Sequence, residues 1–134
     1  MRLLLYLASL DLRRKFLVFP YCTIFPYCRV AHDEEQLELA LAEVGYPISI
    51  AVRASSTFQH YSSGIYDDVE CVDDGGLNHA ILLVGYHKTD PDKMYWIAKN
   101  SWGLNWGGDG YIKMKMGQNT CGVAKRPVYP VIEI

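Results

Sequence analysis

The sequence lacks a charge excess of either sign. Among its 134 residues, 13 Lys and Arg stand against 15 Asp and Glu, which gives a formal net charge of −2 at pH 7. A nucleic-acid-binding domain normally carries a basic patch that neutralises phosphates, and a solvated tail carries a run of like charges. The charge balance therefore indicates neither a nucleic-acid partner nor an acidic tail.

The sequence also lacks a hydrophobic run long enough for a membrane. The N-terminal apolar stretches Leu3–Leu10 and Phe16–Phe25 fall well short of the roughly 20 residues that cross a bilayer. We therefore expect no membrane span. The shorter run, following Arg2, is similar to the start of a secretory signal, but the charged residues after it interrupt it.

We divide the chain into an atypical segment, 1–30, and one domain, 31–134. The first segment is either a degenerate signal peptide or an incorrectly assigned chain start. Half of the residues are hydrophobic and 21% are charged, which excludes a disordered chain. Four cysteines are too few for a small domain held together mainly by disulfides, but they allow one or two disulfides.

A helix is predicted over Glu34–Val44. Asp33 can cap its free N–H groups, and Gln36 three residues later completes a capping-box pattern. Leu37, Leu41 and Val44 fall on one face, and Gly45 can adopt the left-handed conformation that ends a helix.

Strands dominate the rest of the domain. Ile48–Arg53 alternates in polarity and is rich in β-branched residues, which predicts a strand. His79–Tyr86 is nearly all apolar, which predicts a strand buried on both faces. Two more strands are expected at Met94–Lys99 and Gly110–Met116. The fold class is therefore α+β, an antiparallel sheet with one main helix before it.

His79 and Asn100 are the first candidates for chemistry. His79 opens one predicted strand and Asn100 follows the end of the next, so antiparallel pairing would bring the two side chains together. An Asn oxygen can then accept the imidazole N–H and orient the ring for work as a base. The alternative is a structural histidine with no chemical role.

The motifs around these two residues resemble the C-terminal half of papain-like cysteine peptidases, nearest to the cathepsin L-like group. The resemblance runs from about Glu34 to Pro130. Its motifs, in the family's order, are Leu77-Asn78-His79-Ala80, Val84-Gly85-Tyr86, Tyr95-Trp96-Ile97-Ala98-Lys99-Asn100-Ser101-Trp102-Gly103, Trp106-Gly107, Gly110-Tyr111-Ile112 and Cys121-Gly122-Val123-Ala124.

The resemblance implies a role for each matching residue. His79 would be the catalytic histidine and Asn100 the residue that orients it, with Ser101, Trp102 and Trp106 supporting the site. It implies the antiparallel, barrel-like right-hand domain of the papain-like fold, the left-hand helical domain being absent. Cys71 and Cys121 match positions that form a disulfide; the alternative is a buried pair of free thiols.

Substrate contacts are implied for Asn78, Ala80 and Arg126. Arg126 falls at or near the floor of the pocket for the substrate's second residue, where relatives carry small or apolar residues. A guanidinium there would favour an acidic side chain. The alternative is an Arg126 side chain that turns outward into solvent.

The family's nucleophile pattern, similar to Cys-Gly-Ser-Cys-Trp after a Gln, is not found. Cys22 and Cys28 lack the flanking glycine and tryptophan, and Pro20 and Pro26 disfavour a helix there. The nucleophile precedes the histidine by about 130–150 residues in this family, whereas 78 residues precede His79. We therefore expect a fragment of a papain-like endopeptidase that is inactive and prone to aggregation on its own.

Two other hypotheses stay open at this point. A non-catalytic relative would bind a peptide or another peptidase through the cleft wall. A metal-binding module would use the cysteines and the four histidines, whose spacing fits no zinc pattern; the histidines are His32, His60, His79 and His87. The family resemblance implies no cofactor and no metal, a peptide or protein substrate, the absent N-terminal catalytic domain as partner, and a lysosomal or extracellular location.

Overall fold

The computed structural model describes residues 21, 22, 27–71 and 76–131. The signal-like run Leu3–Leu10 lies outside these residues. The strands are β1 (Tyr21–Cys22), β2 (Tyr27–Arg29), β3 (Ile48–Val52), β4 (Ile65–Tyr66), β5 (His79–His87), β6 (Tyr95–Lys99), β7 (Tyr111–Lys115) and β8 (Val128–Pro130). The α-helices are α1 (Glu34–Val44) and α2 (Ser56–Gln59), and the short 3-10 helices are η1 (Pro91–Lys93) and η2 (Thr120–Gly122).

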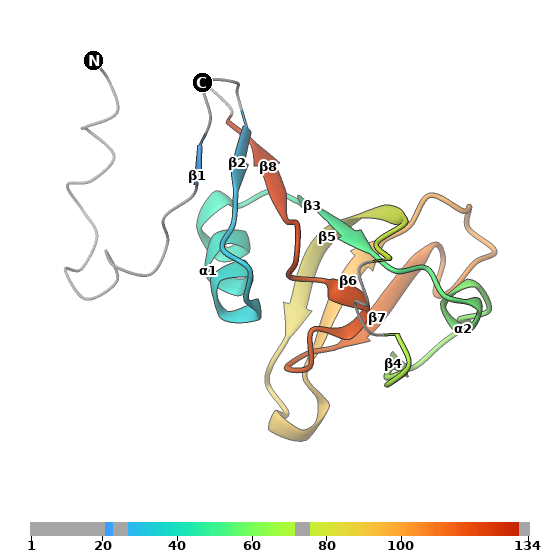
Figure 1. Cartoon of the computed structure of the whole chain (residues 1–134). Helices are drawn as coiled ribbons and strands as arrows, with labels where there is room; N and C mark the ends of the chain where they lie inside the picture. Colours follow the sequence, from blue (N-terminus) through green and yellow to red (C-terminus); the bar gives the residue numbers. More distant parts are fainter. Residues whose placement is uncertain (1–20, 23–26, 72–75, 132–134) are drawn as a thin grey trace, which may run out of the picture.

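All eight strands join one sheet in the order β1-β2-β8-β3-β5-β6-β7-β4. Every pair is antiparallel except β4 with β7. Figure 1 shows α1 near the β2 and β8 end of the sheet and α2 near the β4 and β7 end. The α+β class is confirmed, but the expected barrel-like shape is not. The sheet is open, because β1 and β4 stand at opposite edges and each contributes only two residues to pairing.

Helix α1 has the predicted bounds and caps. The Asp33 side chain accepts a hydrogen bond from the Gln36 backbone N–H at 2.7 Å, and Gly45 has φ 70°. Leu37 and Leu41 are buried, and Val44 packs against the core at its edge. The capping and periodicity patterns were sufficient to predict the bounds of α1, because both depend only on residues close together in the chain.

The carboxylate of Glu34, in the first turn of α1, joins the helix to the sheet. It accepts the Trp96 indole N–H at 2.6 Å and the backbone N–H groups of Gly117 and Asn119 at 2.8 and 3.0 Å. Trp96 itself is fully buried in β6. Charge-assisted hydrogen bonds of this kind are stronger than neutral ones, so Glu34 helps to hold α1 against the sheet.

Strand β5 is not buried on both faces, so that prediction was wrong. Ile81 and Leu83 are buried, whereas Ala80 and Leu82, which alternate with them, are exposed. The sequence hid this alternation because apolar residues occupy both faces of the strand. The structure therefore has an exposed apolar strip on β5, beside the candidate site.

The Cys71–Cys121 disulfide is present, as the family resemblance implied. The Cys121 backbone N–H also donates to the Cys71 carbonyl, at 2.6 Å. Cys28 is disulfide-bonded too, and in the β1–β2 ladder its Cα position stands opposite Cys22.

Strand β2 pairs with β8 near the end of the chain. This pairing brings Tyr27–Arg29, just upstream of the predicted division at residue 30, into the domain's sheet. The exact division stays a prediction. No helix in the described part of the chain is long and apolar enough to cross a membrane.

Candidate active site

His79 and Asn100 lie on neighbouring strands. His79 begins β5, Asn100 follows the last residue of β6, and the two strands run antiparallel. The His79 Nε2 atom is 2.8 Å from the Asn100 Oδ1 atom. The start of one strand thus lies beside the end of the next, the placement expected for these two residues.

The hydrogen bonds around Asn100 determine how the imidazole is protonated. The Asn100 Oδ1 also accepts the Ser101 backbone N–H at 2.7 Å, which identifies this atom as the oxygen of the amide. An amide oxygen only accepts, so the neutral His79 ring must carry its proton on Nε2. The Nδ1 atom is then left with a free lone pair, and no described residue donates a hydrogen bond to it.

Asn100 itself is almost fully buried, with 6% of its surface exposed. Its Nδ2 amide is buried and has no hydrogen-bond partner among the described residues. Its backbone N–H donates to the Gly110 carbonyl at 2.9 Å, which holds the end of β6 against the loop before β7. Burial and backbone bonding restrict the rotation of the side chain that orients His79.

Two aromatic rings, Trp102 and Phe58, contact the histidine, and Trp106 packs behind them. The Trp102 indole stacks on the His79 ring with a centroid distance of 4.7 Å and an interplanar angle of 24°. Phe58 of α2 meets both rings edge-on, at 6.5 and 5.8 Å, and Trp106 packs against Phe58 at 5.5 Å. Phe58 is fully buried beneath Trp102, which is 39% exposed.

Sequence reasoning did not identify Phe58. Its only local signal is the short helix α2, in which the Ser55 hydroxyl accepts the Phe58 backbone N–H at 3.3 Å. The Trp106 indole N–H donates to the carbonyl of Gln59, the next residue, at 2.9 Å. Helix α2 therefore supports the two tryptophans that the motifs place at the site.

The backbone geometry explains why a glycine follows Trp106. Gly107 has φ 58°, and a Cβ atom built there would lie 2.4 Å from the Tyr111 carbonyl oxygen. Residues with a side chain are disfavoured by both the positive φ and the close approach. The Trp106-Gly107 pair thus shapes the loop that carries Trp106 to Phe58.

A hollow of about 430 Å³ opens beside Asn100. Ala80 and Ser101, two predicted site residues, contribute to its wall. The lining residues are Ser49, Ala80, Ile81, Leu82, Lys99, Asn100 and Ser101. The Asn78 side chain is engaged elsewhere, because its Oδ1 accepts the Ala54 backbone N–H at 2.8 Å. Because that bond occupies the amide oxygen, a contact with a substrate would have to use other atoms of Asn78.

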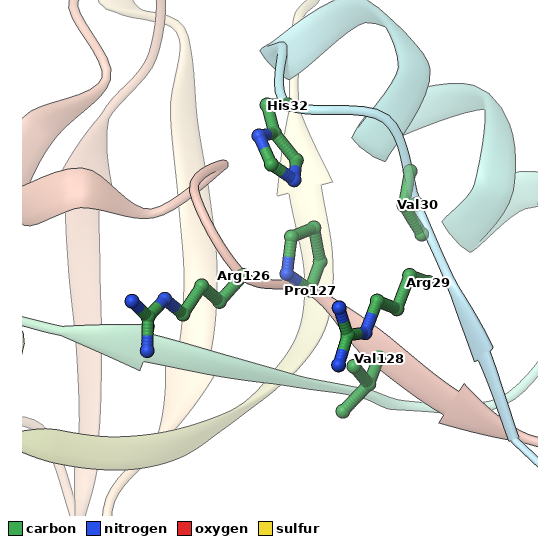
Figure 2. Close-up of a pocket in the computed structure, with 6 residues that line it drawn as sticks. All are labelled: Arg29, Val30, His32, Arg126, Pro127 and Val128. Carbon is green, nitrogen blue, oxygen red and sulfur yellow. The ribbon is translucent and has the colours of Figure 1, made fainter. Parts of the chain in front are cut away.

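Arg126 lines a different pocket, of about 510 Å³. It shares this pocket with Arg29, Val30, His32, Pro127 and Val128 (Figure 2). Arg126 is exposed. Arg29 and His32 were not predicted to join it, because they are near the other end of the chain and only the pairing of β2 with β8 brings them close.

Two titratable groups close to Cys71 in the chain, Asp68 and Tyr66, have altered pKa values. A hydrogen bond from the Thr57 hydroxyl, with a second from the Glu70 backbone N–H, holds the pKa of Asp68 below its ordinary value. Burial raises the pKa of Tyr66. No group of three or more potential metal ligands occurs among the residues that the structure describes.

The chain is similar to known proteins over most of its length. The family model described as papain family cysteine protease matches residues 15–131. Over 102 residues the chain is 46% identical to cathepsin L of Sarcophaga peregrina and 48% identical to cathepsin S of Mus musculus. Each alignment covers 75% of this chain but only 30% and 29% of the relative.

The chain is also similar to a solved protease structure. The bromelain protease from Ananas comosus, in complex with the E64 inhibitor, superimposes with a TM-score of 0.70 at 37% identity. The match covers 81% of this chain and 50% of bromelain. The chain therefore spans about 30% of the length of its curated relatives and half of the aligned structure.

Proposed function

Because the chain belongs to the papain family of cysteine proteases, we propose that it supplies the histidine and asparagine of a peptide-hydrolysing active site. The observation that carries the proposal is the 2.8 Å hydrogen bond between His79 Nε2 and Asn100 Oδ1. This bond leaves Nδ1 as the basic atom of a ring whose orientation is held by a buried partner.

The chemistry follows from that arrangement. His79 Nδ1 takes the proton of a cysteine thiol, and the resulting thiolate attacks the carbonyl carbon of a peptide bond. The imidazolium then gives its proton to the leaving amine, and an acyl-enzyme remains on the sulfur. Water, activated by the neutral imidazole, releases the acid and restores the thiol. Asn100 holds the ring in place throughout.

In this proposal the thiol comes from another part of a longer protein. Cys28, Cys71 and Cys121 are disulfide-bonded, and a disulfide sulfur is not a thiolate nucleophile. We infer that the chain alone does not hydrolyse peptides. The disulfides also favour an oxidising compartment, in keeping with a lysosomal or extracellular location.

A second candidate function is peptide or protein binding without catalysis. The hollow beside Asn100 and the exposed Leu82 and Trp102 would form the binding surface. This alternative is favoured by the lack of a free cysteine thiol among the described residues. A non-catalytic relative would keep the same pocket geometry but would stay inactive even when the remaining domain is supplied.

A chimera separates the two candidates. The part of Sarcophaga peregrina cathepsin L that lies upstream of the matched region is joined to residue 21 of this chain, so that β1 and β2 stay in the sheet. We expect the chimera to hydrolyse a fluorogenic peptide, and we expect the chain alone and the His79→Ala chimera to be inactive. Asn100→Ala should lower kcat while leaving the thiol titratable by an epoxide probe.

One result would reject the peptidase proposal: a chimera that melts cooperatively and reacts with the epoxide probe, yet shows no turnover; that outcome favours the binding module. Turnover by the chain alone with epoxide labelling at Cys22 or Cys28 would instead reject the inference that the chain alone is inactive, because the nucleophile would then lie inside this chain. The His60→Ala chimera is the matched control, because His60 is exposed and its Nδ1 pairs with the Ser56 carbonyl.

A further inference from the structure

A chain of hydrogen bonds connects helix α2 to the carboxylate of Asp68. The Phe58 backbone N–H donates to the Ser55 hydroxyl oxygen at 3.3 Å. The Ser55 oxygen lies 3.0 Å from the Thr57 hydroxyl oxygen and 3.2 Å from that of Tyr66, which are themselves 2.7 Å apart. The Thr57 and Tyr66 hydroxyl groups both donate to Asp68 Oδ2, the second at 3.3 Å. The three hydroxyl groups therefore form one network that ends on a carboxylate.

The carboxylate sets the direction of these hydrogen bonds. An ionised Asp68 only accepts, and the Thr57 hydroxyl and the Glu70 N–H hold its pKa below the ordinary value. Because the single Thr57 hydrogen is used on Asp68, the Thr57 oxygen accepts in its contacts with Ser55 and Tyr66. Hydrogen bonds that run in one direction toward a charge polarise and strengthen one another.

Asp68 is held in place from its backbone side as well. Its Oδ1 accepts the Glu70 backbone N–H at 2.9 Å, and its carbonyl accepts the Cys71 backbone N–H at 3.0 Å. Cys71 is buried and is joined by the disulfide to Cys121. One end of the network is therefore fixed to the disulfide-linked part of the core, and the other end holds α2.

The network supports a ring that lies against His79. Phe58 is fully buried in α2, and a helix of four residues depends on contacts outside itself for its stability. The Tyr66 ring packs edge-on against Phe58, with the centroids 5.7 Å apart. Phe58 in turn meets the rings of His79 and Trp102 edge-on, at 6.5 and 5.8 Å. A shift of α2 would therefore reach the imidazole through direct ring contacts in a close-packed interior.

We propose that Asp68 is a positioning residue for the His79 imidazole and acts through the hydroxyl network and Phe58. Its hydrogen bonds among the described residues go to α2, β4 and its own loop, and none goes to His79 or Asn100. Loss of the carboxylate leaves the hydroxyl groups without their common acceptor, so α2 is held less firmly. The importance of Asp68 for turnover rests on the proposed function, because a misaligned base is a poor catalyst; its effect on the ring does not.

The test observes the His79 ring in the full chain by NMR of 15N-labelled protein. The Nε2–H is bonded to Asn100 and lies beneath the Trp102 ring, so we expect it to exchange slowly with water. Asp68→Asn should make this exchange about fivefold faster and move the 15N shifts of the two ring nitrogens closer together, as both tautomers become populated. Asp68→Glu keeps an acceptor carboxylate and should recover part of the protection.

Two control variants separate positioning from a general loss of stability. Asp67→Asn removes the same charge one residue away, at an exposed carboxylate that pairs with Lys115 at 2.6 Å. Gly117→Ala strains the backbone at φ 96°, beyond the end of β7 and outside the network. Both should leave the Nε2–H exchange rate and the ring 15N shifts of His79 unchanged.

Two further variants remove a hydroxyl and leave the carboxylate in place. Thr57→Val keeps the branched shape, and Tyr66→Phe keeps the ring against Phe58, so both should speed the exchange in the same direction as Asp68→Asn. They also decide the matter if Asp68→Asn does not fold. Folded Asp68→Asn or Thr57→Val protein with the parent exchange rate would overturn the proposal, and so would an equal rise in Gly117→Ala.

The chimera connects the ring to turnover. In an active chimera, Asp68→Asn should lower kcat more than it raises KM, because the alignment of His79 affects the chemical step. A parent chimera that is folded and inactive would reject the proposed function. The exchange rates measured in the chain alone would still decide whether Asp68 positions the ring.

Discussion

The Trp102 indole lies nearly parallel to the His79 imidazole, 4.7 Å away from centroid to centroid. The indole therefore covers one face of the ring whose Nε2 bonds Asn100. A covered hydrogen bond competes less with water, and a stacked ring has fewer orientations available. Trp102 is thus a positioning residue in the proposed site.

Replacement of Trp102 tests this positioning. In the active chimera, Trp102→Ala should lower kcat about tenfold, with a smaller change in KM, because ring orientation affects the chemical step more than substrate binding. Trp102→Phe keeps an aromatic face and should recover much of the rate. Steady-state kinetics at several substrate concentrations separates the two parameters. A rise in KM with kcat unchanged would place Trp102 in substrate binding and not in positioning.

The Cys71–Cys121 disulfide joins residues 50 positions apart and closes a loop that contains β5, η1, β6 and β7. Replacing both cysteines by Ala should lower the free energy of unfolding by about 4 kcal/mol, since the unfolded chain regains the entropy of that loop. Urea unfolding followed by fluorescence measures the change. The single variant Cys71→Ala would leave a free thiol, so the double variant is the cleaner comparison. A loss below about 1 kcal/mol would show that the loop stays ordered without the bond.

The exposed apolar strip should make the isolated chain associate. Leu82 on β5 is 37% exposed, and Trp102, which stacks on His79 at the start of β5, is 39% exposed. Burial of such surface against a second molecule is favourable, so sedimentation should show association that increases with concentration. Leu82→Lys should reduce it, whereas Val69→Lys should not, because Val69 is 74% exposed but lies outside β5. A parent chain that remains monomeric across this range would contradict the expectation.

The elements predicted from sequence were those whose signals are local. Helix α1 follows from Asp33, Gln36 and Gly45, all within thirteen residues, and the structure has these caps. The proximity of His79 and Asn100 was predictable because two strands joined by one turn must run side by side. Both inferences use only the order of residues along one short stretch.

The features that sequence did not reveal depend on contacts between distant segments. Arg29 and His32 meet Arg126 only because β2 pairs with β8, and no local pattern encodes that pairing. Phe58 reaches His79 through the packing of α2, a single turn with a weak signal. The two-sided burial expected of β5 was wrong because Ala80 and Leu82 are apolar although they are exposed. Composition alone cannot distinguish a buried face from one that is available to a partner.

The Gly107 position should tolerate no side chain. An added Cβ would lie 2.4 Å from the Tyr111 carbonyl oxygen and 3.1 Å from the Tyr61 ring, at a φ of 58°. Gly107→Ala should therefore cost about 3 kcal/mol of unfolding free energy, from the strained φ and from the displaced loop. Gly117→Ala is the matched control, because Gly117 has φ 96° but nothing within 4 Å of the added atom. We expect it to cost about 1 kcal/mol. Equal losses in thermal melts of the two variants would show that backbone strain alone is responsible.

The Asp68 carboxylate should make stability depend on pH below the ordinary carboxyl pKa. The Thr57 hydroxyl and the Glu70 N–H stabilise its charged form, so its pKa is lower in the folded chain than in the unfolded one. The unfolded chain then binds more protons. The stabilisation by Asp68 is therefore present above about pH 4 and is lost as pH falls through the folded pKa.

Urea unfolding tests this dependence. Asp68→Asn should have a lower free energy of unfolding than the parent at pH 7, and the difference between the two should narrow toward pH 2.5. Asp92→Asn serves as control, because the exposed Asp92 carboxylate accepts no hydrogen bond among the described residues. A gap between parent and Asp68→Asn that stays constant from pH 7 to pH 2.5 would show that the charged form of Asp68 contributes nothing to folding.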